Sequence, residues 1–154
     1  MTNEITADIC VIGGGSGGLS VAAGASQMGA DVVLLESGKM GGDCLNYGCV
    51  PSKAMIAAAH AAHAVRSAGR FGIDSGEPTV DFEKVHDHVH GVIGAIAPHD
   101  SVERFEGMGV RVIQERGRFV GPNRVQAGDT VITAKRIVIS TGSRAGVPPI
   151  PGLE

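Results

Sequence analysis

The stretch Asp8–Gly18, with the sequence DICVIGGGSGG, decides the fold. Its first part, Asp8–Ile12, is a short apolar run rich in β-branched residues, which is typical of a buried parallel strand. The run ends in glycine, after which the sequence predicts a helix from Gly17 to Gly29 and a second buried strand at Val32–Leu35. A strand, a glycine turn, a helix and a strand in this order form a βαβ unit, whose right-handed crossover makes the two strands parallel.

The glycines of this turn have the spacing of a dinucleotide-binding motif, Gly13-x-Gly15-x-x-Gly18. Gly13 permits a tight turn, Gly15 lets a pyrophosphate approach the backbone, and Gly18 lets the helix pack closely on the strand. The helix N-terminus then offers free N–H groups to phosphates. Glu36, eighteen residues beyond Gly18, can accept hydrogen bonds from an adenosine ribose. The alternative is that these glycines serve only helix–sheet packing.

Composition excludes several classes of protein. Hydrophobic residues make up 43% of the chain, enough for a packed core, and Gly accounts for 24 of 154 residues, well above its usual share of about 7%. The formal net charge of −3 provides no excess of basic charge for nucleic acid or an anionic membrane surface. No run approaches the ~18 apolar residues of a membrane span and no signal-peptide pattern is present, so we expect a cytoplasmic protein.

The rest of the chain predicts further helices and strands. Helices are expected at about 51–69, opened by Pro51, and at about 82–96. After Gly109, short strands separated by Gly, Pro, Asn and Asp indicate a small antiparallel meander, and one more buried strand ends at the Thr141-Gly142 pair. These strands are expected at 110–113, 118–120, 124–126, 131–133 and 136–140.

The proline-rich tail, 147–154, follows the end of the predicted domain. We interpret 1–146 as one domain and 147–154 as a linker with no domain after it.

Two of the three cysteines, Cys44 and Cys49, form a second candidate site. In a reducing compartment, such a close pair is more often catalytic or metal-binding than structural. On one regular helix their Cα atoms would lie roughly 8 Å or more apart, beyond the ~7 Å limit for a disulfide. A disulfide therefore needs a distorted helix or one that begins later, which Gly48 and Pro51 favour. Cys49 would then lie just ahead of the helix, whose positive end and Lys53 both favour a thiolate.

Two other interpretations of the cysteine pair remain open. The pair could bind a metal, although no His or third Cys lies nearby in the sequence, or both thiols could be inert. Cys10, inside the first strand, is expected in the core. His86 and His90 share a helix face at a spacing that can ligate a metal, but without further ligands we favour a solvated face, as for His60 and His63. The sequence therefore predicts no metal site.

Together, the glycine turn, Glu36, the segment 41–53 and the Ser140–Ser143 run resemble the N-terminal part of the class I pyridine nucleotide-disulfide oxidoreductases, the family of dihydrolipoamide dehydrogenase, glutathione reductase and mercuric reductase. The resemblance covers essentially the whole chain. The C-x4-C run followed by Val-Pro-Ser-Lys is its most discriminating part, and the segment 96–105 is most similar to mercuric reductase-like members.

The resemblance implies an α/β, three-layer, Rossmann-like FAD-binding domain with a parallel sheet and a small antiparallel meander. It further implies that electrons pass from NAD(P)H through FAD to a Cys44–Cys49 disulfide. The final acceptor would be a small-molecule substrate, namely a disulfide, a dithiol or a metal ion. We expect Cys49 to face the flavin and Cys44, on a looser glycine-flanked segment, to be the thiol that a substrate reaches more easily.

The same resemblance assigns cofactor contacts to individual residues. Position 43 is commonly Thr in the family, so Asp43 places a carboxylate near phosphates, and Ser140 stands where Ala is common. The implied contacts are Gly13, Gly15, Ser16, Gly18 and Glu36 with the ADP moiety, Gly42 and Asp43 near the pyrophosphate, Thr141 and Gly142 at the cofactor, and Lys53 near the isoalloxazine.

Members of the family continue into an NAD(P)H domain and a dimerisation domain with a His–Glu pair, which these 154 residues do not contain. We therefore expect an incomplete FAD-binding domain from a homodimeric parent, inactive by itself. The alternative is a non-catalytic module that binds FAD or ADP.

Overall fold

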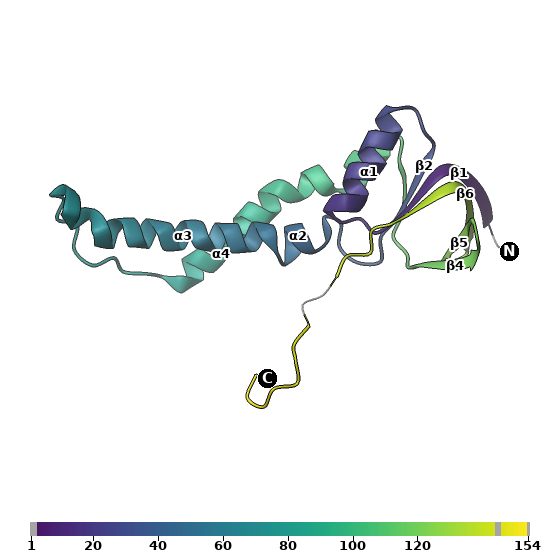
Figure 1. Ribbon diagram of the computed structural model, residues 1–154. Coiled ribbons are helices and arrows are strands. Elements are labelled where there is room, and N and C mark those ends of the chain that lie inside the picture. Colours follow the sequence, from purple (N-terminus) through teal and green to yellow (C-terminus); the bar gives the residue numbers. More distant parts are fainter. Residues whose placement is uncertain (1–2, 144–145, 154) are drawn as a thin grey trace.

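The computed structural model describes residues 3–143 and 146–153. It consists of a sheet with packed helices and a long helical hairpin that extends away from the sheet (Figure 1). The strands are β1 Asn3–Ile12, β2 Val32–Leu35, β3 Arg111–Ile113, β4 Gly117–Gly121, β5 Arg124–Ala127 and β6 Thr130–Ile139. The α-helices are α1 Ser16–Gln27, α2 Gly42–Asn46, α3 Cys49–Ser67, α4 Phe82–Ile96 and α5 Val102–Gly107, with short 3-10 helices η1 Ala68–Phe71 and η2 Ala97–Asp100.

The six strands form one mixed sheet in the order β3-β2-β1-β6-β5-β4. β1 lies between β2 and β6 and is parallel to both, whereas β5 lies between β4 and β6 and is antiparallel to both. The α/β class, the βαβ unit and the small meander predicted from the sequence are therefore confirmed. In a parallel sheet the carboxyl ends of neighbouring strands meet at one edge, which is where ligand sites of open α/β folds form.

One prediction about the meander was wrong. The segment at Arg111–Ile113 is not part of it but lies parallel to β2 at the opposite edge of the sheet. The reason is helix α5, which the sequence analysis did not predict and which brings the chain back to the start of β3 in the parallel direction. Ser101 caps α5, because its hydroxyl accepts a hydrogen bond from the Arg104 N–H.

A second prediction was also wrong, because the two strands expected at 131–133 and 136–140 are a single strand, β6. The prediction left Ala134 and Lys135 between the two strands. In the structure β6 pairs with β1 across this point, and Lys135 makes an ion pair with Asp8 of β1 over 2.6 Å. The neighbouring strand therefore stabilises residues that look like a loop when β6 is considered alone.

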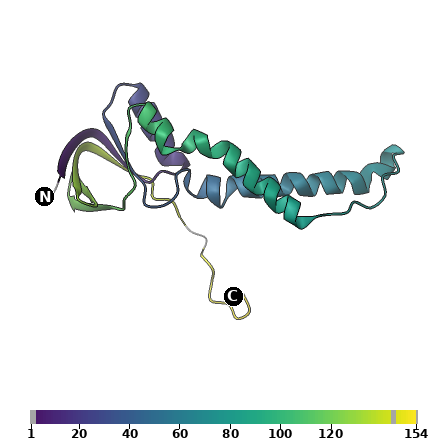
Figure 2. The same ribbon diagram turned by 180° about the vertical axis from the view of Figure 1, so that it is seen from behind.

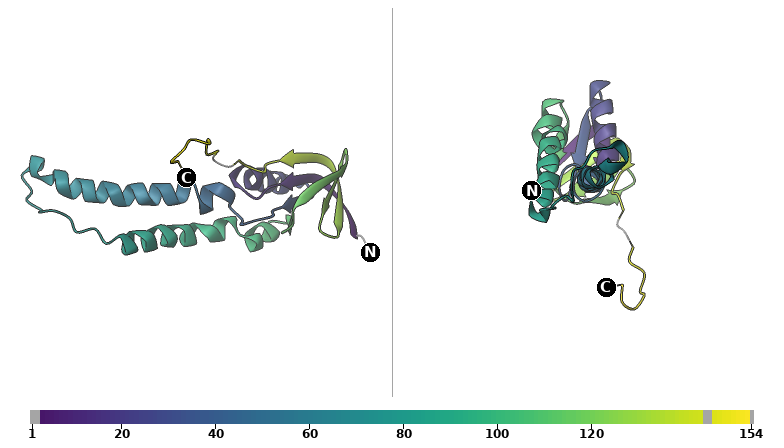
Figure 3. Two further views of the ribbon diagram at one scale, coloured as in Figure 1. Left: turned by 90° about the horizontal axis from the view of Figure 1, so that it is seen from below. Right: turned by 90° about the vertical axis from the view of Figure 1, so that its left-hand side faces the viewer.

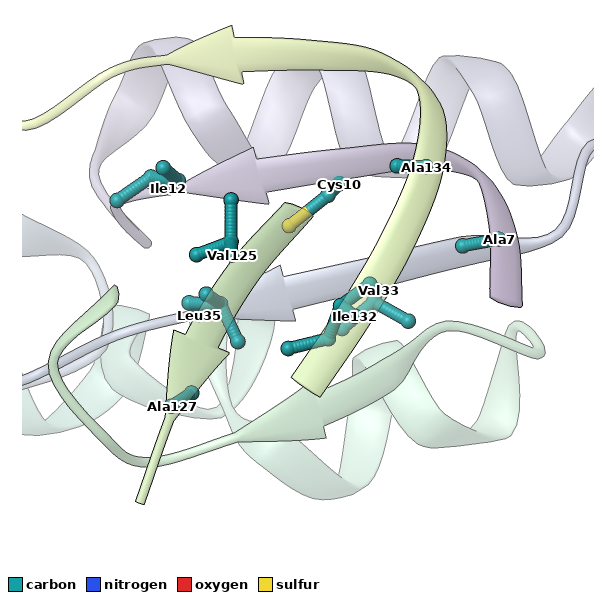
Figure 4. Close-up of a cluster of buried hydrophobic side chains, with 9 residues drawn as sticks. All are labelled: Ala7, Cys10, Ile12, Val33, Leu35, Val125, Ala127, Ile132 and Ala134. Atoms are coloured by element: carbon teal, nitrogen blue, oxygen red, sulfur yellow. The ribbon is translucent and has the colours of Figure 1, made fainter. Parts of the chain in front are cut away.

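The core consists of two clusters on opposite faces of the sheet. In one, β6 curves and carries β5 over β1 and β2, so that Val125 and Ile132 pack against Val33 and Leu35 (Figure 4). Cys10 belongs to this cluster and is fully buried, as predicted. The other cluster lies beneath α1 and α5 and includes Leu34 and Phe105.

Helices α3 and α4 run side by side in opposite directions and extend beyond the sheet (Figures 2 and 3). Asp81 caps α4 by accepting a hydrogen bond from the Lys84 N–H. Most side chains of α3 are exposed, and Ala54 is its one buried residue. Within residues 3–143 and 146–153, no helix is long and apolar enough to cross a membrane.

Candidate functional site

The glycine turn between β1 and α1 allows close approach of backbone to backbone. Gly13 has φ +112°, and a Cβ atom there would overlap the carbonyl of Ser140. A Cβ on Gly18 would overlap the carbonyl of Gly13, so α1 can approach the strand only with glycine at this position. The turn and the close packing that the motif predicts are therefore present.

Among the residues that the structure describes, no side chain caps the N-terminus of α1. Gly15 is its N-cap residue and provides no capping side chain, and the first turn contains no acidic residue. The first helical hydrogen bond runs from the Leu19 N–H to the Gly15 carbonyl, which leaves the N–H groups of Ser16, Gly17 and Gly18 without an intrahelical acceptor. A Cβ on Gly17 would meet no atom within 4 Å. This end of α1 can therefore accept an anionic group such as a phosphate.

Glu36 lies at the carboxyl end of β2 and is tied to the glycine turn. Its carboxylate accepts hydrogen bonds from the Gly14 N–H over 2.6 Å and from the Gly38 N–H over 2.6 Å. A carboxylate has more lone pairs than these two donors use, so it can accept further bonds from a ligand hydroxyl. The sequence analysis predicted the ligand role of Glu36 and missed its bond to Gly14, which joins residues 22 positions apart.

A second glycine pair lies directly against the first turn. The Gly41 N–H donates to the Gly14 carbonyl over 2.9 Å, and Gly41 and Gly15 form an isolated parallel bridge. Gly42 has φ +57°, and a Cβ there would lie only 2.7 Å from the Gly15 Cα. This contact brings the segment that contains the cysteines to the N-terminus of α1.

The segment after β6 reaches the same edge of the sheet. The Ser140 N–H donates to the Ile12 carbonyl over 2.8 Å, which places Ser140 beside Gly13. Thr141 and Gly142 follow and are exposed, with Gly142 at φ +70°. The structure therefore brings the glycine turn, the Gly41–Gly42 segment and the segment 140–142 together at one edge of the sheet.

Cys44 and Cys49 lie on two separate helices. The helical structure is interrupted between α2 and α3, at Tyr47 and Gly48. The N–H groups of both residues donate to the Asp43 carbonyl, over 2.9 Å and 2.7 Å respectively. The predicted break of the helix is thus confirmed. The observed helix bounds differ from the prediction in two ways. Helix α3 begins at Cys49 rather than at Pro51, and Cys44 belongs to a separate helix, α2.

The two thiols are free and lie within hydrogen-bonding reach of each other. The hydrogen bond between them, the partial burial of Cys44 and the charge of Cys49 together raise the pKa of the Cys44 thiol, whereas the Lys53 ammonium opposes the rise. Cys49 is exposed and Cys44 is partly buried. Our expectation that Cys44 is the more accessible thiol is therefore wrong for this chain, because α2 is a folded helix rather than a loose segment.

Asp43 and Lys53 lie beside the cysteine pair. Asp43 is in the first turn of α2 and is exposed, and its Oδ2 atom would lie 2.8 Å from a Cβ on Gly48. Lys53 is exposed on the first turns of α3. Both residues therefore place charge near the thiols.

Asn46 is a residue of this site that the sequence analysis missed. Its Nδ2 atom donates to the carbonyls of Met40, over 3.0 Å, and Gly42, over 2.8 Å. These bonds fix the end of α2 to the loop that contacts the glycine turn. The position of Asn between the two cysteines was the available signal.

The described residues contain no group of three or more His, Cys, Asp or Glu side chains that could hold a metal ion. Within the described residues, the tertiary structure therefore brings no further metal-ligating side chain to the cysteine pair.

Comparison with known proteins agrees with this geometry. Residues 7–154 match the family described as pyridine nucleotide-disulphide oxidoreductase. The chain is 37% identical over 145 residues to a dihydrolipoyl dehydrogenase of Halobacterium salinarum, covering 89% of this chain and 30% of that protein. It is 35% identical over 153 residues to a mercuric reductase of Streptomyces lividans, covering 96% and 32%. The chain thus spans about a third of the length of these relatives.

A solved structure shares the fold. The flavoprotein disulfide reductase RclA from Escherichia coli, in a Cu(II) complex, superposes with a TM-score of 0.75 at 24% identity, covering 94% of this chain and 30% of that chain. The family match over residues 7–154 establishes that the chain belongs to the pyridine nucleotide-disulphide oxidoreductase family, whose members bind FAD.

Proposed function

We propose that this chain binds FAD through its ADP half and provides the redox-active cysteine pair of a flavoprotein. The longer protein would transfer electrons from NAD(P)H to a disulfide, dithiol or metal-ion substrate. The observation that supports this most directly is the contact of Gly42 with Gly15, because it joins the anion-accepting end of α1 to the segment that holds Cys44 and Cys49. The small-molecule substrate and the homodimeric parent stay predictions.

The residues at the carboxyl edge of the sheet fit an ADP group. The free N–H groups at the start of α1 suit a pyrophosphate, and Glu36 is held by Gly14 at the position where a ribose hydroxyl would bind. A negative charge at position 36 favours a free ribose hydroxyl over a 2′-phosphate, because two negative charges repel. We therefore assign the ADP moiety to Gly13, Gly15, Ser16, Gly18 and Glu36, its pyrophosphate also to Gly42 and Asp43, and the rest of the cofactor to Thr141, Gly142 and Lys53.

FAD, when bound, supplies two-electron chemistry between a nicotinamide and a thiol pair. The chain's own residues supply the thiols. Oxidation of the pair forms the Cys44–Cys49 disulfide and releases two electrons and two protons. The hydrogen bond to Cys49 and the partial burial of Cys44 raise the pKa of the Cys44 thiol. We assign Cys49, at the first turn of α3, to the flavin side and Cys44 to exchange with substrate, as the family resemblance implies.

The alternative is a module that binds FAD or ADP without catalysis. The nucleotide site described here involves neither thiol, so binding alone is compatible with this alternative.

Calorimetric titration of the 154-residue chain with ADP, FAD and NADP⁺ tests the binding proposal. We expect FAD and ADP to bind more tightly than NADP⁺, and Gly18→Ala to abolish binding. Gly24→Ala in the same helix is the matched control, since a Cβ there would meet no atom within 4 Å. Tighter binding of NADP⁺, or unchanged binding in Gly18→Ala, would contradict the proposal.

A second experiment separates the redox proposal from simple binding. Mild oxidation of the chain should form a Cys44–Cys49 disulfide, seen by peptide mass spectrometry as the loss of two hydrogens. A chain that binds FAD without forming this disulfide would support the non-catalytic module.

A further inference from the structure

Two histidines of α4 form a pair outside the site described above. The rings of His86 and His90 lie with their centroids 4.1 Å apart and tilted by 37°. Both residues are exposed, and the side chain of His86 is 62% accessible. The pair therefore lies on the surface of the helical hairpin rather than in its core.

The Nδ1 atoms of both rings face acceptors of the protein. Nδ1 of His90 lies 3.0 Å from the carbonyl oxygen of His86, and Nδ1 of His86 lies 3.8 Å from a carboxylate oxygen of Asp87. A carbonyl oxygen can only accept, so the His90 nitrogen that faces it carries the proton. The Asp87 carboxylate is beyond hydrogen-bond distance of His86 Nδ1, so it attracts a proton there only through its charge. A neutral imidazole whose Nδ1 carries the proton has its lone pair on Nε2.

This arrangement is the one that metal-binding imidazoles use. A ligating histidine commonly donates its other ring N–H to a carbonyl or carboxylate, which fixes its tautomer and orientation. An ion held tetrahedrally at 2.0–2.1 Å from two nitrogens places these nitrogens about 3.3 Å apart. Two rings whose centroids lie 4.1 Å apart are close enough for rotation about the side-chain torsions to bring one nitrogen of each ring to this separation. No movement of the helix backbone is needed, because residues at i and i+4 already share a face.

We propose that His86 and His90 form a two-imidazole site for a divalent cation of the Zn²⁺, Ni²⁺ or Cu²⁺ class, the ions that imidazole ligands suit. The described residues contribute no third His, Cys, Asp or Glu to the pair. The ion therefore keeps open positions that water fills, and it exchanges readily, unlike a structural zinc with four protein ligands. The site is separate from the cysteines and does not depend on the proposed redox function.

Titration with Zn²⁺ alone, followed by calorimetry, tests the site. The measurement is made on the full chain with Cys44→Ser and Cys49→Ser, because free thiols also bind zinc. We expect one Zn²⁺ per chain, with affinity reduced about tenfold or more by His86→Ala or by His90→Ala, since the second ligand then no longer acts within the same molecule. These exposed positions tolerate alanine, the residue with the highest helix propensity.

His88→Ala is the matched control. It removes a histidine of the same helix, but residue 88 points away from the face that His86 and His90 share. We expect it to change the affinity for Zn²⁺ less than about twofold, as for an exposed group that makes no contact with the ion. In NMR spectra, the imidazole signals of His86 and His90 should shift together on addition of Zn²⁺ while those of His88 do not. Absence of binding, or equal loss of affinity in all three variants, would overturn the proposal.

Discussion

The Cα atoms of Gly15 and Gly42 approach each other so closely that a Cβ on Gly42 would lie 2.7 Å from the Gly15 Cα. Gly15 is the N-cap residue of helix α1, and Gly42 is the first residue of helix α2, which carries Cys44. The start of the nucleotide-binding helix and the start of the thiol-bearing helix are thus in direct backbone contact. Any side chain at position 42 would separate them.

Substitution Gly42→Ala should therefore impair both stability and FAD binding. Alanine at φ +57° costs about 1–2 kcal/mol from its backbone conformation alone, and the overlap with Gly15 adds to this cost. Urea denaturation measures the free energy of unfolding, and titration measures FAD binding. Gly69→Ala is the control, since a Cβ there would meet no atom within 4 Å and its φ is not positive. Equal effects of the two substitutions would show that the Gly15–Gly42 contact is unimportant.

Glu36→Gln should weaken FAD binding and destabilise the chain. The glutamine amide can replace one acceptor oxygen but presents N–H donors to the other backbone N–H group, so one of the bonds to Gly14 and Gly38 is lost. Loss of one hydrogen bond to a charged group costs about 1.5–3 kcal/mol, with the lower end expected at this half-exposed position. Denaturation of Glu77→Gln, which removes an exposed carboxylate paired with Arg66, provides the comparison. A destabilisation no larger than that of Glu77→Gln would contradict the assigned role of Glu36.

The pKa of Cys44 should respond to both of its charged neighbours in opposite directions. The hydrogen bond and the charge of Cys49 raise this pKa, so Cys49→Ser should lower it. Lys53 lowers it, so Lys53→Gln should raise it. The pH dependence of iodoacetamide alkylation at Cys44, followed by peptide mass spectrometry, measures the pKa because only the thiolate reacts. His63→Gln, on the same helix but several turns away, should leave the profile unchanged. A profile insensitive to Cys49→Ser would show that the two thiols do not interact.

Cys10 should make the stability of the chain sensitive to alkaline pH. Burial raises the pKa of Cys10 from 9.0 to about 11, because the thiolate is poorly solvated in the core. The neutral thiol is thus favoured in the folded state, and this contribution to stability is fully present below pH 9 and is lost as the pH rises towards 11. The loss amounts to about 1–3 kcal/mol.

The difference in unfolding free energy between the wild type and Cys10→Ala, measured from pH 8 to pH 11, isolates this effect. The wild type should lose more stability than the variant over this range, while at pH 8 the variant is destabilised by the cavity that the missing sulfur leaves. Parallel stability curves for the two proteins would show that Cys10 does not titrate with a raised pKa.

The sequence alone determined the βαβ unit, the glycine turn and the residues of the thiol pair. These features depend on local order, since a strand that ends in glycine before a helix of small residues can form few other structures. The break between Cys44 and Cys49 was also predictable, because Gly48 and Pro51 disfavour one continuous helix through both cysteines.

Only the tertiary structure decided how distant segments meet. The single strand β6, with Lys135 paired to Asp8, and the parallel placement of β3 depend on neighbouring strands that supply hydrogen bonds and opposite charge. The same holds for the bond of Glu36 to Gly14 and for the contact of Gly42 with Gly15. Periodicity describes which residues along one segment are apolar, whereas these pairings depend on which segments lie side by side, and that is decided by packing of the whole chain.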